Sequence, residues 1–206
     1  MKIVIASHNL GKVNEIKKYF EGVVCESKQP FLPVVLSLTD VGFTADLDAI
    51  ENGTTFEENA IKKAKFVQQT LGFDGLVLAD DSGLEIDALG GLPGVDSANF
   101  MGRDTSYAKR FEHILGQMGK DSRSARFVAV MALATKNGIT TFRATMEGEI
   151  ALSVAGEGGF GYDPIFYLPK MGKTSAQISL DEKNKISHRG KALRKVVEYI
   201  YENFSV

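Results

Sequence analysis

The sequence contains a single cysteine, Cys25, among 206 residues. One cysteine excludes an intrachain disulfide and any zinc site that needs several cysteines, and it is consistent with a reducing compartment. No stretch approaches the roughly 20 apolar residues of a membrane-spanning helix. Residues 1–9 hold an apolar run that is too short for the core of a signal peptide, and no small-residue cleavage pattern follows it. We therefore expect a cytoplasmic protein.

An excess of charge of one sign is also missing. The chain has 24 Lys and Arg residues against 26 Asp and Glu residues, a formal net charge of -2. This balance gives no global reason to expect nucleic acid or a membrane as a partner, so any phosphate binding has to be local. The chain has no internal repeat and no low-complexity linker, and its length suits one domain over residues 1–206.

The hydrophobic pattern alternates between strand and helix along the first half of the chain, which indicates an α/β fold. A later pair of strands around a turn at residues 136–138 predicts a hairpin. We therefore expect a mixed central sheet flanked by helices. The predicted strands are Lys2–Ser7, Val23–Glu26, Leu76–Ala79, Arg126–Thr135 and Ile139–Ala151, and the predicted helices are Gly11–Phe20, Thr55–Leu71, about Thr105–Met118, and one from about Ser187 onward. Gln29, Pro30 and Pro33 predict an irregular connection.

Two adjacent carboxylates, Asp80 and Asp81, follow the apolar run at residues 76–79. Acids in such a place are costly to bury without partners. Neighbouring side chains of a strand face opposite ways, so both acids could point into one cleft only if the strand had already ended. We interpret one of the two as structural, and we expect a site at the carboxyl end of this strand.

A polar turn, Ser7 to Lys12, separates the first predicted strand from the first predicted helix. Free N–H groups and the positive end of a helix favour an anion there, and Lys12 adds a mobile charge. The turn is not a Walker A loop, because Gly11 has no glycine four residues before it and Lys12 is followed by Val13. A phosphate cradle and a plain polar turn with a solvated lysine both remain open.

A glycine-rich loop at residues 156–161 has the spacing of a dinucleotide fingerprint but not its context, because Pro164 and aromatic residues follow where a helix should begin. We interpret the loop as one that brings backbone and the ring of Phe160 or Tyr162 against a planar ligand. A bulged turn with core aromatics is the alternative.

A basic group precedes and begins the last helix. Cations at a helix N-terminus oppose the helix dipole, so they indicate an anion or an acidic partner nearby, although a solvated basic face is the alternative. The group comprises Lys183, Lys185, His188 and Arg189.

Carboxylates are the only plentiful metal ligands. Oxygen ligands together with substrate phosphates suit Mg²⁺, and no His or Cys spacing competes for a transition metal. The candidate acids are Glu51, Glu57, Glu58, Asp80, Asp81, Glu85 and Asp87, of which Glu58 is already explained as a helix-capping residue.

Five segments, in this order, resemble the inosine triphosphate pyrophosphatase family, whose members are dITP/XTP pyrophosphatases. The resemblance spans nearly the whole chain and implies a two-lobed fold with the active-site cleft between the lobes, a homodimer, and hydrolysis of deaminated purine nucleoside triphosphates to the monophosphate and pyrophosphate. The segments are SHNLGK at 7–12, ENGTTFEENAIKKA at 51–64, LADDSGLEIDALGGLPGVDSA at 78–98, GGFGYDPIF at 158–166 and KISHRGKAL at 185–193.

The resemblance also implies roles for individual residues. Glu51 and Asp81 would hold Mg²⁺, and Asp81 would accept the proton of the attacking water. The phosphates would be held by Ser7, His8, Asn9, Leu10, Gly11 and Lys12, chiefly through Asn9 and Lys12.

Further substrate contacts follow from the same resemblance. Phe160 would stack on the base, Asp163 would lie near the ribose or the base edge, and Arg189 would read the 6-oxo group that distinguishes inosine from adenosine. The remaining implied contacts are Lys63, Ser82, Gly161, Tyr162, Lys183 and His188.

Two other functions compete with hydrolysis. A nucleotide-binding sensor with little turnover would not need the carboxylates Glu51 and Asp81 beside a triphosphate. A single-strand nucleic-acid binder that uses Phe160, Tyr162 and basic residues is disfavoured by the acidic balance of the chain.

Overall fold

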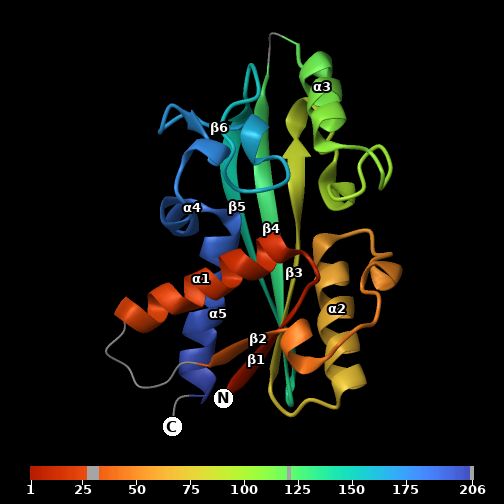
Figure 1. The fold of residues 1–206 in the computed structure, drawn as a ribbon, viewed down its shortest axis with the longest axis vertical. Helices are drawn as coiled ribbons and strands as arrows, with labels where there is room; N and C mark the ends of the chain where they lie inside the picture. The colour runs from red at the N-terminus through yellow and green to blue at the C-terminus, as the bar shows by residue number, and fades with distance from the viewer. Residues whose placement is uncertain (27–32, 120–121, 205–206) are drawn as a thin grey trace. The chain divides into compact units, whose positions relative to one another are not determined.

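The computed structural model describes residues 1–26, 33–119 and 122–204 (Figure 1). Its helices are α1 (Leu10–Glu26), α2 (Phe56–Leu71), α3 (Tyr107–Gln117), α4 (Leu180–Ile186) and α5 (His188–Phe204). Its strands are β1 (Lys2–Ala6), β2 (Val34–Ser37), β3 (Leu76–Ile86), β4 (Ser124–Thr135), β5 (Gly138–Ile150), β6 (Phe166–Leu168) and β7 (Lys173–Thr174). Among the residues described, no helix is both long and apolar enough to cross a membrane.

The strands form one mixed sheet in the order β2-β1-β3-β4-β5-β6-β7. Strand β1 is parallel to both β2 and β3, with Ile5 opposite Ser37 on one side and Leu78 on the other. Strand β6 is antiparallel to β5 and β7. The α/β fold with a mixed sheet is thus confirmed.

Two compact units share this sheet. Unit 1 comprises residues 1–81, 129–144 and 189–206, and unit 2 comprises residues 82–128 and 145–188. Strands β3, β4 and β5 contribute residues to both units. The single functional domain over residues 1–206 and the cleft between two lobes stay predictions.

Unit 1 has helices on both faces of its strands, with α1 and α5 on one face and α2 on the other (Figure 1). A buried apolar cluster fills the face that α1 and α5 cover. It includes Ile5, Leu78 and Met131 from the strands and Ile16 and Leu193 from the helices. Alternation along a strand sends every second side chain to the α2 face. Each face of this half of the sheet is therefore closed by apolar side chains.

Unit 2 has its own buried cluster. Leu84 and Ile86 of β3 pack there with Phe127 of β4, Ile114 of α3 and Phe166 of β6. This packing carries the loop at residues 156–165 and helix α4, which contain the aromatic and basic residues predicted to bind a base.

The predicted strand at Val23–Glu26 is wrong, because α1 continues to Glu26. The helix continues through Gly22, because a glycine inside a helix costs only about 1 kcal/mol. The buried side chains of Val13, Ile16 and Phe20 hold the helix on the sheet. The second strand is instead β2, and Gln29 and Pro30 of the predicted irregular connection lie outside the described residues.

The strand before Asp80 and Asp81 was predicted to end at Ala79. Instead, β3 includes both acids and continues to Ile86. The two carboxylates can be buried within the strand because each is paired with a cation, which offsets the cost of removing its charge from water. Helix α4 and strands β6 and β7 were not predicted. Helix α2 matches its prediction, with the Thr55 side chain accepting from the Glu58 N–H and Gly72 in the left-handed conformation at its C-terminus.

Candidate active site

The turn between β1 and α1 is ordered by its own side chains. The Asn9 N–H donates to Ser7 Oγ at 3.2 Å, and the Lys12 N–H donates to Asn9 Oδ1 at 3.1 Å. Asn9 is therefore the N-cap of α1, and the turn forms the N-terminus of this helix. His8 is exposed, with Nε2 3.0 Å from the Ala45 carbonyl oxygen, and Leu10 is 75% exposed.

Asp80 lies at the centre of a buried charge network. Its carboxylate is fully buried, 2.7 Å from Lys12 Nζ and 3.1 Å from Arg189 Nε. Arg189 also donates through Nη1 to Glu15 of α1, which is buried as well. Burial alone would raise the pKa of Asp80, but Arg189 and Lys12 outweigh it and hold that pKa well below its usual range. The network anchors Lys12 at the polar turn.

Asp81 faces the other side of β3. Its Oδ1 is 3.1 Å from Lys63 Nζ, and its Oδ2 accepts from Asn59 Nδ2 at 3.3 Å. Lys63 Nζ also lies 2.8 Å from Glu51 Oε1 and donates to the Asp80 backbone oxygen at 2.6 Å. The strand therefore divides the adjacent acids as expected, with Asp80 toward α1 and α5 and Asp81 toward α2.

The electrostatics of this second group favour a base. Burial raises the pKa of the Asp81 carboxyl, and although Lys63 lowers it, Glu51 raises it again and the net direction is upward. For Lys63, burial would lower the pKa, but Asp81 and Glu51 outweigh burial and raise it, so the ammonium keeps its proton. Asp81 is thus a buried carboxylate with increased proton affinity beside a permanent cation.

The same donor set suits Mg²⁺. Glu51 and Asp81 direct oxygens at one point, now the Lys63 ammonium, and Mg²⁺ is commonly held by one or two carboxylates together with substrate phosphates. No group of three or more His, Cys, Asp or Glu side chains suited to a metal occurs in the part of the chain described. Mg²⁺ bound by one or two carboxylates completes its coordination with water and substrate phosphates.

Unit 2 brings together the aromatic and basic residues predicted to bind a base. Asp163 is 1% exposed, and its Oδ2 accepts from the Phe160 N–H at 2.8 Å and from Lys183 Nζ at 2.5 Å. Lys183 Nζ lies 5.1 Å from the centre of the Phe160 ring, a cation–π distance. Asp163 thus fixes both the backbone that presents Phe160 and the lysine beneath it.

Two other predicted residues of unit 2 are packed inside it. The Tyr162 hydroxyl donates to the Ser97 carbonyl oxygen at 2.9 Å, and its ring meets Tyr107 edge-on at 5.3 Å. His188 is buried and stacks on Phe127 with ring centres 4.9 Å apart. Direct contact of these two side chains with substrate stays a prediction, as do the contacts of Ser82 and Gly161.

A model of the Ham1 family matches residues 3–199 of the chain. The chain belongs to the Ham1 family. A dITP/XTP pyrophosphatase from a Thermoanaerobacter species is 40% identical over 203 residues, which cover 97% of this chain and 96% of that protein. One from an Exiguobacterium species is 47% identical over 198 residues, 95% of each chain.

Solved structures of Ham1 proteins show the same fold. The Staphylococcus aureus Ham1 protein superimposes with a TM-score of 0.81 at 38% identity and covers 98% of this chain and 99% of its own. A HAM1 protein from Coxiella burnetii gives a TM-score of 0.83 at 36% identity over the same shares of the two chains. The resemblance seen in the sequence motifs is thus confirmed.

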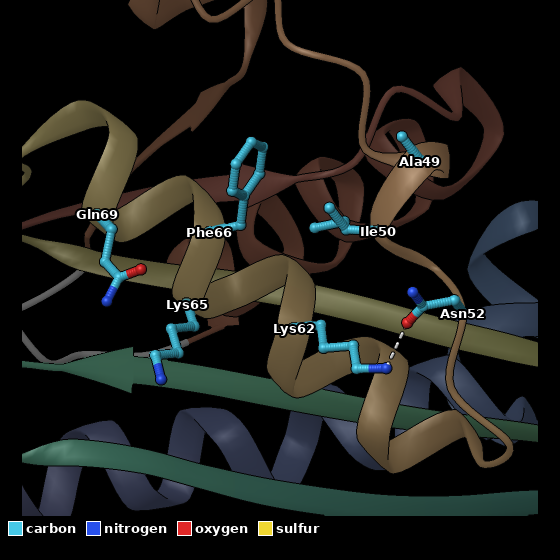
Figure 2. Close-up of a pocket in the computed structure, with 7 residues that line it drawn as sticks. All are labelled: Ala49, Ile50, Asn52, Lys62, Lys65, Phe66 and Gln69. Carbon is cyan, nitrogen blue, oxygen red and sulfur yellow. Dashed lines mark hydrogen bonds between the residues drawn. The ribbon is translucent and has the colours of Figure 1, made fainter.

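A pocket of about 330 Å³ in this Ham1 protein lies along α2 (Figure 2). Figure 2 shows Lys62 reaching Asn52, with Phe66 and Ile50 at the apolar part of the pocket. The residues that line it are Ala49, Ile50, Asn52, Lys62, Lys65, Phe66 and Gln69, and none of them was predicted to bind substrate. The pocket borders the chain segment that carries Glu51.

Sequence reasoning missed two residues of the unit 1 network. Glu15 is buried against Arg189, and Asn59 links Asp81 to the backbone of Gly53. Asn59 lies in the motif at residues 51–64, but its spacing from Asp81 in the sequence carries no signal. Glu15 sits among apolar positions of α1, and an acid on a helix's buried stripe is the pattern that could have marked it.

Gly159 provides a test of the Asp163 arrangement in this Ham1 chain. It has a φ of +70°, and an added Cβ would lie 2.1 Å from Asp163 Oδ2. Gly159→Ala should therefore displace Asp163 and destabilise the protein by more than the about 1–2 kcal/mol that a left-handed alanine costs by itself. Gly90→Ala is the matched control, because Gly90 has a φ of +63° and open space around it. Chemical denaturation compares the two, and equal losses of stability would contradict the prediction.

Proposed function

We propose that this protein hydrolyses deaminated purine nucleoside triphosphates (inosine, deoxyinosine and xanthosine triphosphates) to the nucleoside monophosphate and pyrophosphate. The observation that carries the proposal is the group in which Asp81 and Glu51 share the Lys63 ammonium. Relatives over nearly the whole chain are named dITP/XTP pyrophosphatases, which supports the same reaction and substrate class. Such hydrolysis would remove deaminated purines from the nucleotide pool.

The residues of unit 1 suit the triphosphate. Lys12 and the first-turn N–H groups of α1 would hold phosphate oxygens, with Ser7 and Asn9 shaping the turn. Asp80 holds the Lys12 side chain at the turn through an ion pair of 2.7 Å. A triphosphate oxygen would bind the Lys12 ammonium in competition with Asp80.

Asp81 is proposed as the general base. It would accept a proton from a water molecule whose oxygen attacks phosphorus, and the bond between the α and β phosphates would break, releasing pyrophosphate. Lys63 holds one oxygen of Asp81, leaving the carboxylate oriented for the transfer. Mg²⁺, held by Glu51 and Asp81, would supply positive charge to the phosphate oxygens.

The residues of unit 2 suit the base. Phe160 would stack on the purine. Asp163 and Lys183 hold Phe160 in position, through its backbone N–H and its ring respectively. A donor aimed at the 6-oxo group would be left unpaired against the amino group of adenine, which is a strong form of discrimination. That Arg189 supplies this donor stays a prediction.

Product analysis tests the function. The purified protein is incubated with Mg²⁺ and, in turn, the triphosphates of inosine, xanthosine, guanosine and adenosine, and the products are separated by ion exchange. The expected products are the monophosphate and pyrophosphate, with kcat/KM for inosine triphosphate at least about 10²-fold above that for adenosine triphosphate. A diphosphate with orthophosphate would contradict the proposal. Binding without turnover would favour the alternative, a nucleotide sensor.

We also propose a cytoplasmic homodimer that binds neither nucleic acid nor membrane. Free nucleotides as substrates and a charge of -2 without an excess of either sign support the last two points. Sedimentation velocity should give about twice the mass of one 22.4 kDa chain. A monomer at micromolar concentration would contradict the dimer.

A further inference from the structure

The segment at residues 51–54 is bound along its whole length by side chains of α2. The partners run in reverse order, so the segment lies antiparallel to the first turns of the helix. The contacts are Lys63 Nζ to Glu51 Oε1 at 2.8 Å, Lys62 Nζ to Asn52 Oδ1 at 2.6 Å, the Gly53 N–H to Asn59 Oδ1 at 2.7 Å, and the Thr54 N–H to Glu58 Oε2 at 2.8 Å. The Lys62 contact is drawn in Figure 2.

Asn59, like Lys63, also contacts Asp81, so its side chain joins the segment to that carboxylate. Its Nδ2 donates to Asp81 Oδ2 at 3.3 Å while its Oδ1 accepts from Gly53. A backbone N–H can only donate, so the amide oxygen must face Gly53 and the NH₂ group must face Asp81. The hydrogen-bond network therefore determines the orientation of this amide, which is only 4% exposed.

The Asp81 carboxylate is consequently held at both oxygens. Lys63 contacts Oδ1 and Asn59 contacts Oδ2, so rotation of the carboxylate would break at least one contact. Lys63 also contacts Glu51, and Asn59 also holds the segment that carries Glu51. The two carboxylates are thus connected through two separate side chains of one helix.

Gly53 shows how closely this contact is packed. A Cβ added to Gly53 would lie 2.6 Å from Asn59 Oδ1 and 2.8 Å from Glu58 Cβ. Any larger residue would therefore push the segment off the helix or displace the amide. The approach of backbone to Asn59 depends on the glycine.

We propose that Asn59 is a positioning residue: one end of its amide holds the segment at residues 51–54, the other end orients the Asp81 carboxylate, and together they set Asp81 relative to Glu51. The inference rests on the proposed function, because it assigns Asn59 a part in aligning the proposed base. In this proposal Asn59 acts through its contacts with Asp81 and Gly53.

Two substitutions separate the two ends of the amide. Asn59→Asp keeps an oxygen for the Gly53 N–H but turns an oxygen instead of an NH₂ group toward Asp81, whereas Asn59→Ala removes both contacts. If the donor orients Asp81, both variants lose about 10–100-fold in kcat with KM near the wild-type value. Asn59→Asp also adds a negative charge beside Asp81, so Asn59→Ala, which removes the donor without adding charge, is the deciding variant. Wild-type kcat in Asn59→Ala would overturn the proposal.

Gln68→Ala is the matched control. Gln68 lies on the same helix, is partly buried, and donates to the Thr135 carbonyl oxygen at 3.3 Å, so it also loses a buried hydrogen bond when truncated. Its kcat should equal that of the wild type. Thermal unfolding of all three variants, followed by circular dichroism, separates a loss of alignment from a loss of folded protein.

A second readout needs neither nucleotide nor metal. In a ¹H–¹⁵N spectrum of the resting protein, the side-chain NH₂ signals of Asn59 are assigned by their absence in Asn59→Asp. Asp81→Ala should shift these signals and speed their exchange with water, and unchanged signals would overturn the proposal. Because this result does not depend on turnover, it distinguishes failure of the inference from failure of the proposed function.

Discussion

Replacing Asp81 with asparagine is expected to lower kcat for inosine triphosphate by roughly 10²–10⁴-fold, the usual contribution of a general base. The amide has nearly the shape of the carboxylate but cannot take up a proton from water. The surroundings of Asp81 are suited to that role, since burial raises the pKa of its carboxyl and Lys63 stays protonated beside it. Nucleotide binding should remain measurable, because Lys12 and its turn belong to a separate set of contacts.

Single-turnover kinetics with inosine triphosphate measure the effect, and calorimetric titration with the nucleotide measures binding. Asp87→Asn is the control, because Asp87 follows the same strand but is exposed and paired with Arg126 at 2.8 Å. That variant should keep the wild-type kcat. Wild-type turnover in Asp81→Asn would remove Asp81 as the base. A loss of both turnover and binding would mean that the carboxylate mainly holds the metal that binds the phosphates.

That Asp80 and Asp81 face opposite sides of the strand was predictable from the sequence, because strand geometry alone sends adjacent side chains to opposite faces. The family resemblance pointed to Asp81, but the side that each acid faces could not be predicted from strand geometry. It depends on which helix covers which face, and so on contacts with Arg189 and Lys63, which lie 109 and 18 residues away from their partners. Hydrophobic periodicity carries no information on such pairs.

The elements that were predicted correctly are those with their own local signals. Helix α2 has an N-cap at Thr55, an apolar stripe and Gly72 at its end, and all three appear in the structure. The false strand at Val23–Glu26 came from a short apolar run in which helix and strand patterns look alike. Strands β6 and β7 have three and two residues, too few for an alternating pattern to be recognised.

The residues that hold the site in place were the hardest to predict. Glu15 contacts Arg189, and Asn59 contacts Asp81 and the Gly53 backbone. Their positions follow from the packing of α1 and α2, which a single sequence does not specify. The acids and lysines of the site were found more easily, because charged residues at strand ends and turns are costly to bury and therefore indicate partners or a ligand.

Arg189 is the predicted residue whose surroundings differ most from its expected role. The resemblance implies that it reads the 6-oxo group of the base. In the structure its Nε and Nη2 donate to the two oxygens of Asp80, its Nη1 donates to Glu15, and the side chain is 1% exposed. This geometry supports a role in holding Asp80, and through it Lys12, at the polar turn.

Arg189→Ala is therefore expected to lower the free energy of unfolding by about 3–5 kcal/mol, because it leaves two buried carboxylates without their shared cation. Arg189→Lys should lose less, since it keeps a charge but cannot form the paired hydrogen bonds of a guanidinium. Arg194→Ala, an exposed position on the same helix, is the control and should change stability by less than about 0.5 kcal/mol. Urea denaturation measures all three.

The same variants decide between the two roles of Arg189. If it reads the base, Arg189→Ala keeps near wild-type stability and loses the preference for inosine over adenosine triphosphate. If it holds Asp80, stability falls and the preference among the protein that remains folded is unchanged, while KM rises because Lys12 is no longer fixed at the turn. A loss of both would place Arg189 in the two roles at once, which requires its guanidinium to leave Glu15 or Asp80 when the nucleotide binds.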